Sequence, residues 1–159
     1  MDELLKILQA NACESRENIA KMLGVSVADV ERRIADYEKR GVIRGYQAIL
    51  NEDKLELDTV TAVIEVKVTP EREGGFNRVA ERLSRFPEVR SAYLMSGTYD
   101  LLLFVEGSNL HQVASFVSAK LATLDGVLST STHFMLKTYK RLGVLMESEH
   151  EDERLTVSP

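Results

Sequence analysis

The sequence predicts an α+β protein in which an N-terminal helix-turn-helix, of the winged type by a resemblance described below, precedes a ferredoxin-like βαββαβ domain. Two observations carry this prediction. From Asp2 to Gly41 the apolar residues recur with the period of helices, and a glycine separates the second helical segment from the third. From Val60 onwards they alternate as in a half-buried strand, and strands and helices then follow in the order β-α-β-β-α-β.

The first two helices are predicted from an apolar stripe and from end signals. The stripe on the first helix consists of Leu4, Leu5 and Leu8. A second helix is expected over residues 16–23, because Ser15 is a favoured cap at its start and Gly24 is a favoured residue at its end. The short connection between the second and third helices is typical of a helix-turn-helix.

The third helix starts after Ser26, and Asp29 three residues later has the spacing of a capping box. Its buried stripe is predicted to consist of Val30, Ile34 and Tyr37. Gly41 fits the left-handed position that follows a helix. The chain then becomes extended, and residues 44–58 are predicted to connect two domains. A short strand within this connector is favoured by the alternation of Tyr46, Ala48 and Leu50.

The second domain begins with a strand over residues 60–68, which Pro70 ends. A helix follows, marked by Phe76, Val79, Ala80, Leu83 and Phe86. Strands over residues 89–94 and 99–105 are expected to form a hairpin through residues 95–98. A second helix is marked by Val113, Phe116, Val117 and Leu121. The last strand is expected from Val127 to about Tyr139.

The predicted sheet has both helices on one face, so its other face needs cover, and a second copy of the chain is the expected cover. The predicted domains are 1–45 for the helix-turn-helix, 46–58 for the connector, 59–141 for the ferredoxin-like domain and 142–159 for an acidic tail. The chain has 159 residues and a net charge of −5. Residues 1–50 hold 8 basic and 8 acidic side chains, so the acid excess lies in the second part.

Several classes of protein are excluded by the sequence. The single cysteine, Cys13, cannot form an intrachain disulfide, and no Cys/His cluster has the spacing of a zinc site. His111 and His133 have no nucleophile adjacent in sequence, so no catalytic residue, metal or cofactor is predicted. The start of the chain does not read as a signal peptide, and the longest central apolar run covers only residues 101–105. We therefore expect a cytoplasmic protein without a membrane span.

Three stretches of the chain resemble the Lrp/AsnC (feast/famine) family of transcriptional regulators. The helix-turn-helix reads RENIAKMLGVS over residues 16–26, then VERRI over 30–34 and YEKRGVI over 37–43. The second domain contains SGTYD at residues 96–100 and GVLSTST at residues 126–132. The resemblance covers roughly residues 1–141.

This resemblance implies a regulator that binds double-stranded promoter DNA and responds to an amino acid or a related small molecule. It also implies a homodimer that assembles to a higher oligomer, often an octamer. On this basis residues 59–141 are predicted to be an effector-binding and oligomerisation domain of the RAM type.

The resemblance places the effector near the loop Gly97-Thr98-Tyr99-Asp100. An amino acid needs an acceptor for its ammonium group, which Asp100 can supply. It also needs donors for its carboxylate, which the backbone around Gly97 and hydroxyls such as that of Thr132 can supply. The local alternative is that Gly97 serves only the hairpin and Asp100 bonds only the backbone of the turn.

Residues 26–40 would form the recognition helix in the major groove. Arg32 is the predicted reader of a guanine edge, and Lys21 is a further nearby cation. The predicted DNA-binding residues are Ser26, Val27, Ala28, Glu31, Arg32, Arg33, Lys39, Arg40 and Arg44.

Two features of this helix favour weak DNA binding by a single dimer. Arg33 and Arg40 stand four residues after Asp29 and Asp36, so they can form ordinary helix-surface ion pairs. Glu31 lies at the groove or its edge, where it either accepts from cytosine or repels phosphate. We therefore expect DNA binding to depend on several dimers acting together.

Two other functions remain open. The first is a small-molecule-binding assembly protein of the same fold that has weak or no DNA affinity. The second is an enzyme related to the sirohaem decarboxylases, a branch that resembles the same family. The His and Arg cluster of that branch has no counterpart here in residues 55–68. The acidic tail could also compete with DNA for the basic helix.

Overall fold

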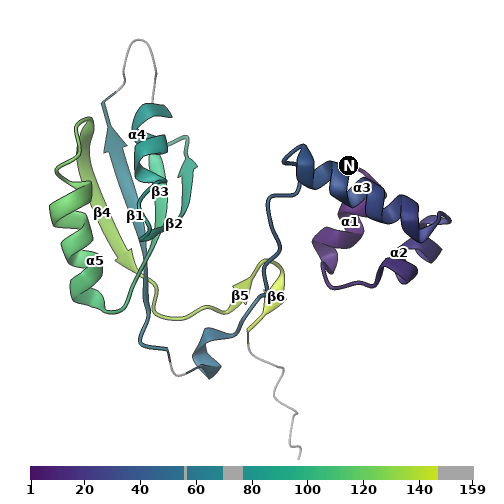
Figure 1. Cartoon of the computed structure of the whole chain (residues 1–159). Coiled ribbons are helices and arrows are strands. Elements are labelled where there is room, and N and C mark those ends of the chain that lie inside the picture. Colours follow the sequence, from purple (N-terminus) through teal and green to yellow (C-terminus); the bar gives the residue numbers. More distant parts are fainter. Residues whose placement is uncertain (56, 70–76, 147–159) are drawn as a thin grey trace, which may run out of the picture. The chain divides into compact units, whose positions relative to one another are not determined.

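The computed structural model describes residues 1–55, 57–69 and 77–146 (Figure 1). The chain divides into two compact units, Met1–Ile49 (unit 1) and Leu50–Pro159 (unit 2). The three predicted helices of unit 1 and the β-α-β-β-α-β order of unit 2 are confirmed. The predicted helix residue Phe76 and the acidic tail from residue 147 onwards lie outside the described residues.

Unit 1 consists of α1 (Glu3–Ala10), α2 (Arg16–Leu23) and α3 (Val27–Lys39). The predicted caps Ser15 and Ser26 each accept the backbone N–H of the residue three positions on, at 3.1 Å. Gly24 ends α2 with φ 65°, a left-handed conformation that favours glycine. The unit 1 core consists of Leu4, Leu8, Ile19, Ala20, Val30 and Ile34. Burial of such a side chain contributes about 1.5–3 kcal/mol, so the three short helices depend on one another.

The strand predicted around Tyr46 and Leu50 is wrong for the described chain: residues 44–50 have no regular structure, and a single turn of 3-10 helix, η1 (Glu52–Lys54), follows. A strand requires a partner backbone, and sequence alternation does not supply one. Tyr46 instead donates its hydroxyl to Glu38 at 2.9 Å, which ties the start of this segment to α3.

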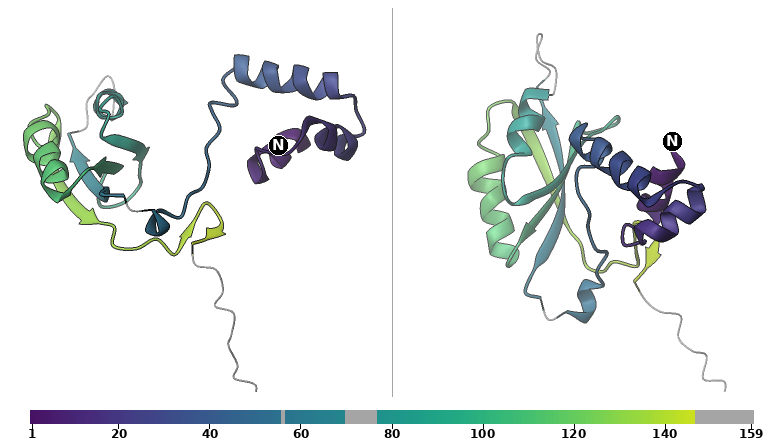
Figure 2. Two further views of the ribbon diagram at one scale, coloured as in Figure 1. Left: turned by 60° about the horizontal axis from the view of Figure 1, so that its bottom comes forward. Right: turned by 45° about the vertical axis from the view of Figure 1, so that its right-hand side comes forward.

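Unit 2 contains a four-stranded antiparallel sheet in the order β2-β3-β1-β4. Its strands are β1 (Val60–Val68), β2 (Val89–Leu94), β3 (Leu101–Gly107) and β4 (Val127–Phe134). The helices that connect them are α4 (Asn77–Leu83) and α5 (Leu110–Phe116) (Figures 1 and 2). A single π-helical turn, η2 (Val117–Leu121), continues α5 and ends before Gly126.

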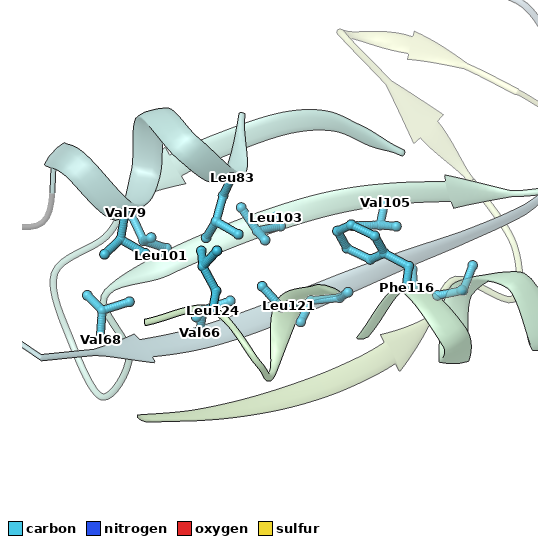
Figure 3. Close-up of a cluster of buried hydrophobic side chains, with 13 residues drawn as sticks. Val66, Val68, Val79, Leu83, Leu101, Leu103, Val105, Phe116, Leu121 and Leu124 are labelled. Carbon is cyan, nitrogen blue, oxygen red and sulfur yellow. The ribbon is translucent and has the colours of Figure 1, made fainter. Parts of the chain in front are cut away.

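One face of this sheet packs on both helices (Figure 3). Leu101, Leu103 and Val105 alternate along β3 with no exposed surface, and the neighbouring residues of β3 are half-buried on the other face. From the helices, Val79, Leu83, Val113 and Phe116 enter the same cluster. The prediction that both helices lie on one side of the sheet is therefore confirmed, and we call the other side the open face.

Two strand boundaries differ from the prediction. β3 begins at Leu101 rather than Tyr99, and β4 ends at Phe134 rather than about Tyr139. Phe134 is paired with Ala62, close to the start of β1, so β4 stops where its partner strand runs out.

A short hairpin follows β4 and consists of β5 (Lys140–Arg141) and β6 (Val144–Leu145). The domain boundary predicted between residues 141 and 142 therefore falls inside a hairpin. Met146, directly after it, is 7% exposed and its carbonyl accepts the amide N–H of Asn51. The hairpin is also tied to η1, because Arg141 pairs with Glu52 at 2.6 Å.

Candidate DNA-binding helix and candidate ligand site

The exposed side of α3 lies opposite the side that faces the unit 1 core. Along its middle runs the exposed stripe, which consists of Ala28, Glu31, Arg32, Ala35 and Lys39 at helical spacing, and Asp36 and Glu38 are exposed beside it. The stripe carries two cations and one carboxylate, and Asp36 and Glu38 add two further carboxylates to the exposed side. The small side chains of Ala28 and Ala35 let another molecule approach the stripe closely at these two positions.

Val27 differs from the other residues predicted near the start of α3. A DNA-binding residue has to be exposed, but Val27 is half-buried against the unit 1 core. Val27 stands three residues before Val30 and seven before Ile34, which places it on the buried side of the helix. Ser26 is exposed and holds the helix start, because its hydroxyl oxygen accepts a hydrogen bond from the backbone N–H of Asp29.

Arg32 and Arg33 of α3, and Arg40 directly after it, are paired with carboxylates of the helix. Asp29 binds Arg32 and lies 3.8 Å from the guanidinium of Arg33. Asp36 pairs with Arg40 at 2.9 Å, so the two predicted i,i+4 pairs are present. The Arg32 side chain nevertheless keeps 74% of its surface exposed. Exposed pairs on a helix contribute only about 0.3–0.5 kcal/mol, so a phosphate or base can replace the carboxylate partner.

Arg33 is held in a different way from Arg32. Both oxygens of Asp2 accept hydrogen bonds from its guanidinium, at 2.7 and 2.8 Å. The Tyr37 hydroxyl also donates to Asp2. Together these bonds lower the pKa of Asp2 from 3.8 to about 2. The bond from Tyr37 has the largest effect on this pKa, and the bonds from Arg33 have the second largest. The same bond to the Asp2 carboxylate raises the pKa of Tyr37. Arg33 therefore joins the start of α1 to the middle of α3.

Besides Lys39 of the exposed stripe, two further cations of unit 1 are exposed, namely Lys21 and Arg44. None of the ion pairs formed within the described residues involves them. Exposed cations without an ion-pair partner, on or near α3, are suited to phosphate contacts.

In unit 2 the predicted effector loop joins β2 to β3. It closes through the Met95 N–H, which donates to the Asp100 carbonyl at 2.8 Å. Gly97 adopts φ 141°, which side-chain-bearing residues rarely reach. The Asp100 carboxylate accepts the backbone N–H of Val68 at 2.9 Å, and its own N–H donates to Val66. Asp100 thus fastens the loop to the end of β1 with one of its two carboxylate oxygens.

A hollow of about 250 Å³ lies next to this loop on the open face of the sheet. Its lining consists of Glu65, Lys67, Thr98, Tyr99, Ser129, Thr130 and Ser131. The structure thus brings two predicted effector residues, Thr98 and Tyr99, together with β1 and β4. Gly97 and Asp100 do not line the hollow. Thr132 lies on the helix side of the sheet, since its cross-strand partner Ile64 is fully buried there.

Glu65 and Lys67 are residues of this hollow that the sequence analysis missed. The available signal was the alternation of β1, whose apolar positions face the core and whose remaining positions include these two charges. A carboxylate oxygen of Glu65 lies 3.5 Å from Nε2 of His133, and the Ser131 hydroxyl lies 3.3 Å from the same nitrogen. The hollow offers one anionic group, one cationic group and several hydroxyls.

A larger hollow, of about 450 Å³, lies beside α4. Its lining consists of Arg78, Val79, Glu81, Arg82, Arg85 and Asp125. It contains none of the predicted site residues, and its cations and carboxylates are interspersed.

Within the ranges that the structure describes, no group of three or more His, Cys, Asp or Glu side chains could hold a metal ion. In those same ranges, no helix has both the length and the apolar character needed to cross a membrane.

Two family models match the chain. Residues 3–44 match a winged helix-turn-helix DNA-binding domain, and residues 61–145 match the Lrp/AsnC ligand binding domain. Among curated relatives, YugG of Bacillus subtilis strain 168, an uncharacterized HTH-type transcriptional regulator, is 49% identical over 158 residues. That alignment covers 99% of this chain and 95% of the relative.

Solved structures agree with this assignment. An AsnC family transcriptional regulator from Agrobacterium tumefaciens is 30% identical, with a TM-score of 0.66 and coverage of 89% of this chain and 94% of that one. A transcriptional regulator from Neisseria meningitidis, solved as an L-methionine complex, is 25% identical with the same TM-score and covers 89% and 93%. With both units matched, in order and over nearly the whole length, the chain belongs to the Lrp/AsnC family of transcriptional regulators.

Proposed function

We propose that this regulator binds promoter DNA through α3 and changes its DNA affinity or its assembly when an amino acid binds to unit 2. The observation that carries the DNA half is the exposed stripe of α3, which lies opposite the unit 1 core and is free of bulky apolar side chains. A helix of this kind fits the major groove.

The residues of unit 1 have separate roles in this proposal. Arg32 reads a guanine edge from the exposed stripe, because its guanidinium is largely exposed and presents the bidentate fork that guanine accepts. Lys39, Arg40, Arg44 and Lys21 meet phosphates, which sets orientation and salt dependence. Arg33 acts through Asp2 by holding α3 in place on α1.

The ligand half of the proposal rests on the hollow beside the β2–β3 loop. Its charged and hydroxyl side chains match the ammonium and carboxylate groups of a free amino acid. The L-methionine complex of the Neisseria meningitidis relative supports an amino acid as the class of ligand. Asp100 contributes by fastening the loop to β1, so that Thr98 and Tyr99 are held at the hollow.

Assembly couples the two halves. The open face carries half-buried Leu102 and Phe104 and the 52%-exposed Tyr93, an apolar area that a second copy of the chain would cover. The two-fold symmetry of such a dimer would then place two α3 helices about one DNA turn apart, so that they meet the two halves of a palindromic site in cytoplasmic DNA. Stacking of dimers to an octamer would let several weak contacts act together.

The proposal is tested by fluorescence anisotropy with DNA from upstream of the protein's own gene. Binding is measured at two salt concentrations, with and without a mixture of the standard L-amino acids. We expect affinity that falls with salt in proportion to the phosphates contacted, and a shift when the mixture is present. Equal binding to random competitor DNA, or no effect of the mixture, would contradict the corresponding half of the proposal.

A second function is favoured by one observation. Glu31 lies on the exposed stripe of α3, and four cations of unit 1 are paired with carboxylates of unit 1. Both features oppose phosphate binding, so the protein could bind an amino acid without binding DNA. Ligand binding in the absence of any DNA binding at low salt would establish this alternative. A Glu31→Gln variant that gained DNA affinity would identify the carboxylate as the cause.

A further inference from the structure

The open face of the sheet divides into an apolar half and a polar half. Tyr93 and Phe104 pack edge to face on β2 and β3, with ring centroids 6.1 Å apart. The polar half lies on β1 and β4 and consists of Glu65, Lys67, Ser129, Ser131 and His133. The hollow beside the β2–β3 loop lies within this polar half. A second copy of the chain can therefore cover the apolar half without burying the charges of Glu65 and Lys67.

The register of β1 and β4 gives each charge a hydroxyl neighbour. Glu65 is paired with Ser131, and Lys67 is paired with Ser129. Residues directly opposite one another on an antiparallel pair have Cβ atoms about 4.5–5.5 Å apart. The two charges are two residues apart on one strand, so they leave the same face about 6–7 Å from each other.

Neither charge is neutralised by the other. No ion pair joins Glu65 to Lys67, and the Lys67 ammonium has no ion-pair partner in the described part of the chain. The neighbour of Glu65 is His133, at 3.5 Å, and this contact is an ion pair only when the imidazole is protonated. A separated carboxylate and ammonium, each with a hydroxyl beside it, are complementary to a molecule in which an ammonium group and a carboxylate group are bonded to the same carbon atom.

We propose that Glu65 and Lys67 are the two charge contacts that hold the amino acid, one at each end of the ligand, and we call them the clamp. The Glu65 carboxylate accepts from the α-ammonium group of the ligand. The Lys67 ammonium, together with the hydroxyls of Ser129 and Ser131, donates to its α-carboxylate. This inference rests on the proposed amino-acid response and assigns it to residues outside the loop that the sequence indicated. Asp100 then holds the loop rather than the ligand.

The test uses isothermal titration calorimetry on the full chain, with each standard L-amino acid as a separate probe. The amide and the deamino analogue of any amino acid that binds are then titrated. The variants are Glu65→Gln and Lys67→Met. The matched controls are Glu106→Gln, a carboxylate on the same open face whose partner is Arg90, and Lys140→Met, an exposed strand lysine of unit 2.

We expect each clamp variant to bind the amino acid at least about tenfold more weakly, and each control to bind like the unmodified chain. The loss should be specific to one end of the ligand. Glu65→Gln should no longer distinguish the amino acid from its deamino analogue, and Lys67→Met should no longer distinguish it from its amide. Circular dichroism melting and the mass of the assembly in solution check that the variants fold and associate normally.

Two results would overturn the assignment, and they are distinguishable. Unchanged amino-acid affinity in both clamp variants would reject Glu65 and Lys67 while leaving the amino-acid response intact. No binding of any amino acid to the unmodified chain would reject the response itself together with the clamp. If a variant fails to fold, the unmodified chain still decides the matter. Equal affinity for the amino acid, its amide and its deamino analogue would exclude a two-charge clamp.

Discussion

The charges of α3 and those of the open sheet face are organised in opposite ways. On α3, Arg32 and Arg40 are paired with carboxylates three or four residues away on the same helix. On the sheet, Glu65 and Lys67 are opposed by serines from β4, more than sixty residues later in the chain. The helix thus carries a surface whose charges are balanced locally, whereas the sheet presents charges that a ligand can complete.

This difference teaches where each surface is vulnerable. A single substitution on the exposed side of α3 changes one contact and keeps the helix folded. The helix is held by Val30 and Ile34 on its other side, which pack in the unit 1 core. The hollow on the sheet exists only while β1, β4 and the β2–β3 loop stay in register, and that register is held by the core beneath them. A substitution that loosens the core of unit 2 should therefore disturb the whole hollow. A substitution on the exposed side of α3 should disturb only the contact that it removes.

The largest effect should come from the core under the sheet. Leu103→Ala removes a fully buried side chain between the helices and β3 and should lower the free energy of unfolding by about 2–5 kcal/mol. Leu102→Ala, on the open face, should cost clearly less because Leu102 is only half-buried. Chemical denaturation followed by circular dichroism compares the two. Equal losses would contradict the division of the sheet into a core face and an open face.

The next effect should come from the loop anchor. Asp100→Ala leaves the Val68 N–H without its acceptor, which should cost about 1–3 kcal/mol of stability and weaken the amino-acid response. DNA affinity without the amino acid should stay unchanged, as measured by anisotropy. Asp100→Asn keeps an acceptor oxygen and serves as the control. An Asn variant as impaired as the Ala variant would show that the negative charge, not the hydrogen bond, is what matters.

On α3 the sharpest comparison is between two arginines of the exposed side. Arg32→Ala should weaken binding to the specific site by about 1–3 kcal/mol and relax sequence preference at one position, as expected for a base contact. Arg40→Ala should weaken binding about equally for all sequences and lower the salt slope by about 1, as expected for a phosphate contact. Anisotropy at several salt concentrations separates them. Unchanged affinity in Arg32→Ala would remove this side chain from the interface.

The smallest effect concerns the link between α1 and α3. The folded state lowers the pKa of Asp2 from 3.8 to about 2, so the carboxylate stabilises unit 1 above pH 4. This contribution should disappear as the pH falls from about 4 to about 2, because the group is protonated through that range. Denaturation of Asp2→Asn should lack this part of the pH dependence. The same pH dependence in the variant would assign it to another carboxylate.

Much of the fold could be predicted because its signals are local. Ser15, Ser26 and Gly24 mark helix ends through bonds to residues within four positions, and these bonds are present. The alternation in β1 likewise separates its core-facing side from its open side before any partner strand is known. The same reasoning failed at residues 46–50, where alternation occurs without a partner backbone.

The candidate sites divide in the same way. The sequence by itself determined α3 and its ion pairs, since residues three and four apart on a helix are always neighbours. It also marked the β2–β3 loop through Gly97. Only the tertiary structure decided that Asp100 bonds β1, that Thr132 faces the helices and that Glu65 and Lys67 line the hollow. Those facts depend on strand register, and register is chosen by packing between segments far apart in the chain.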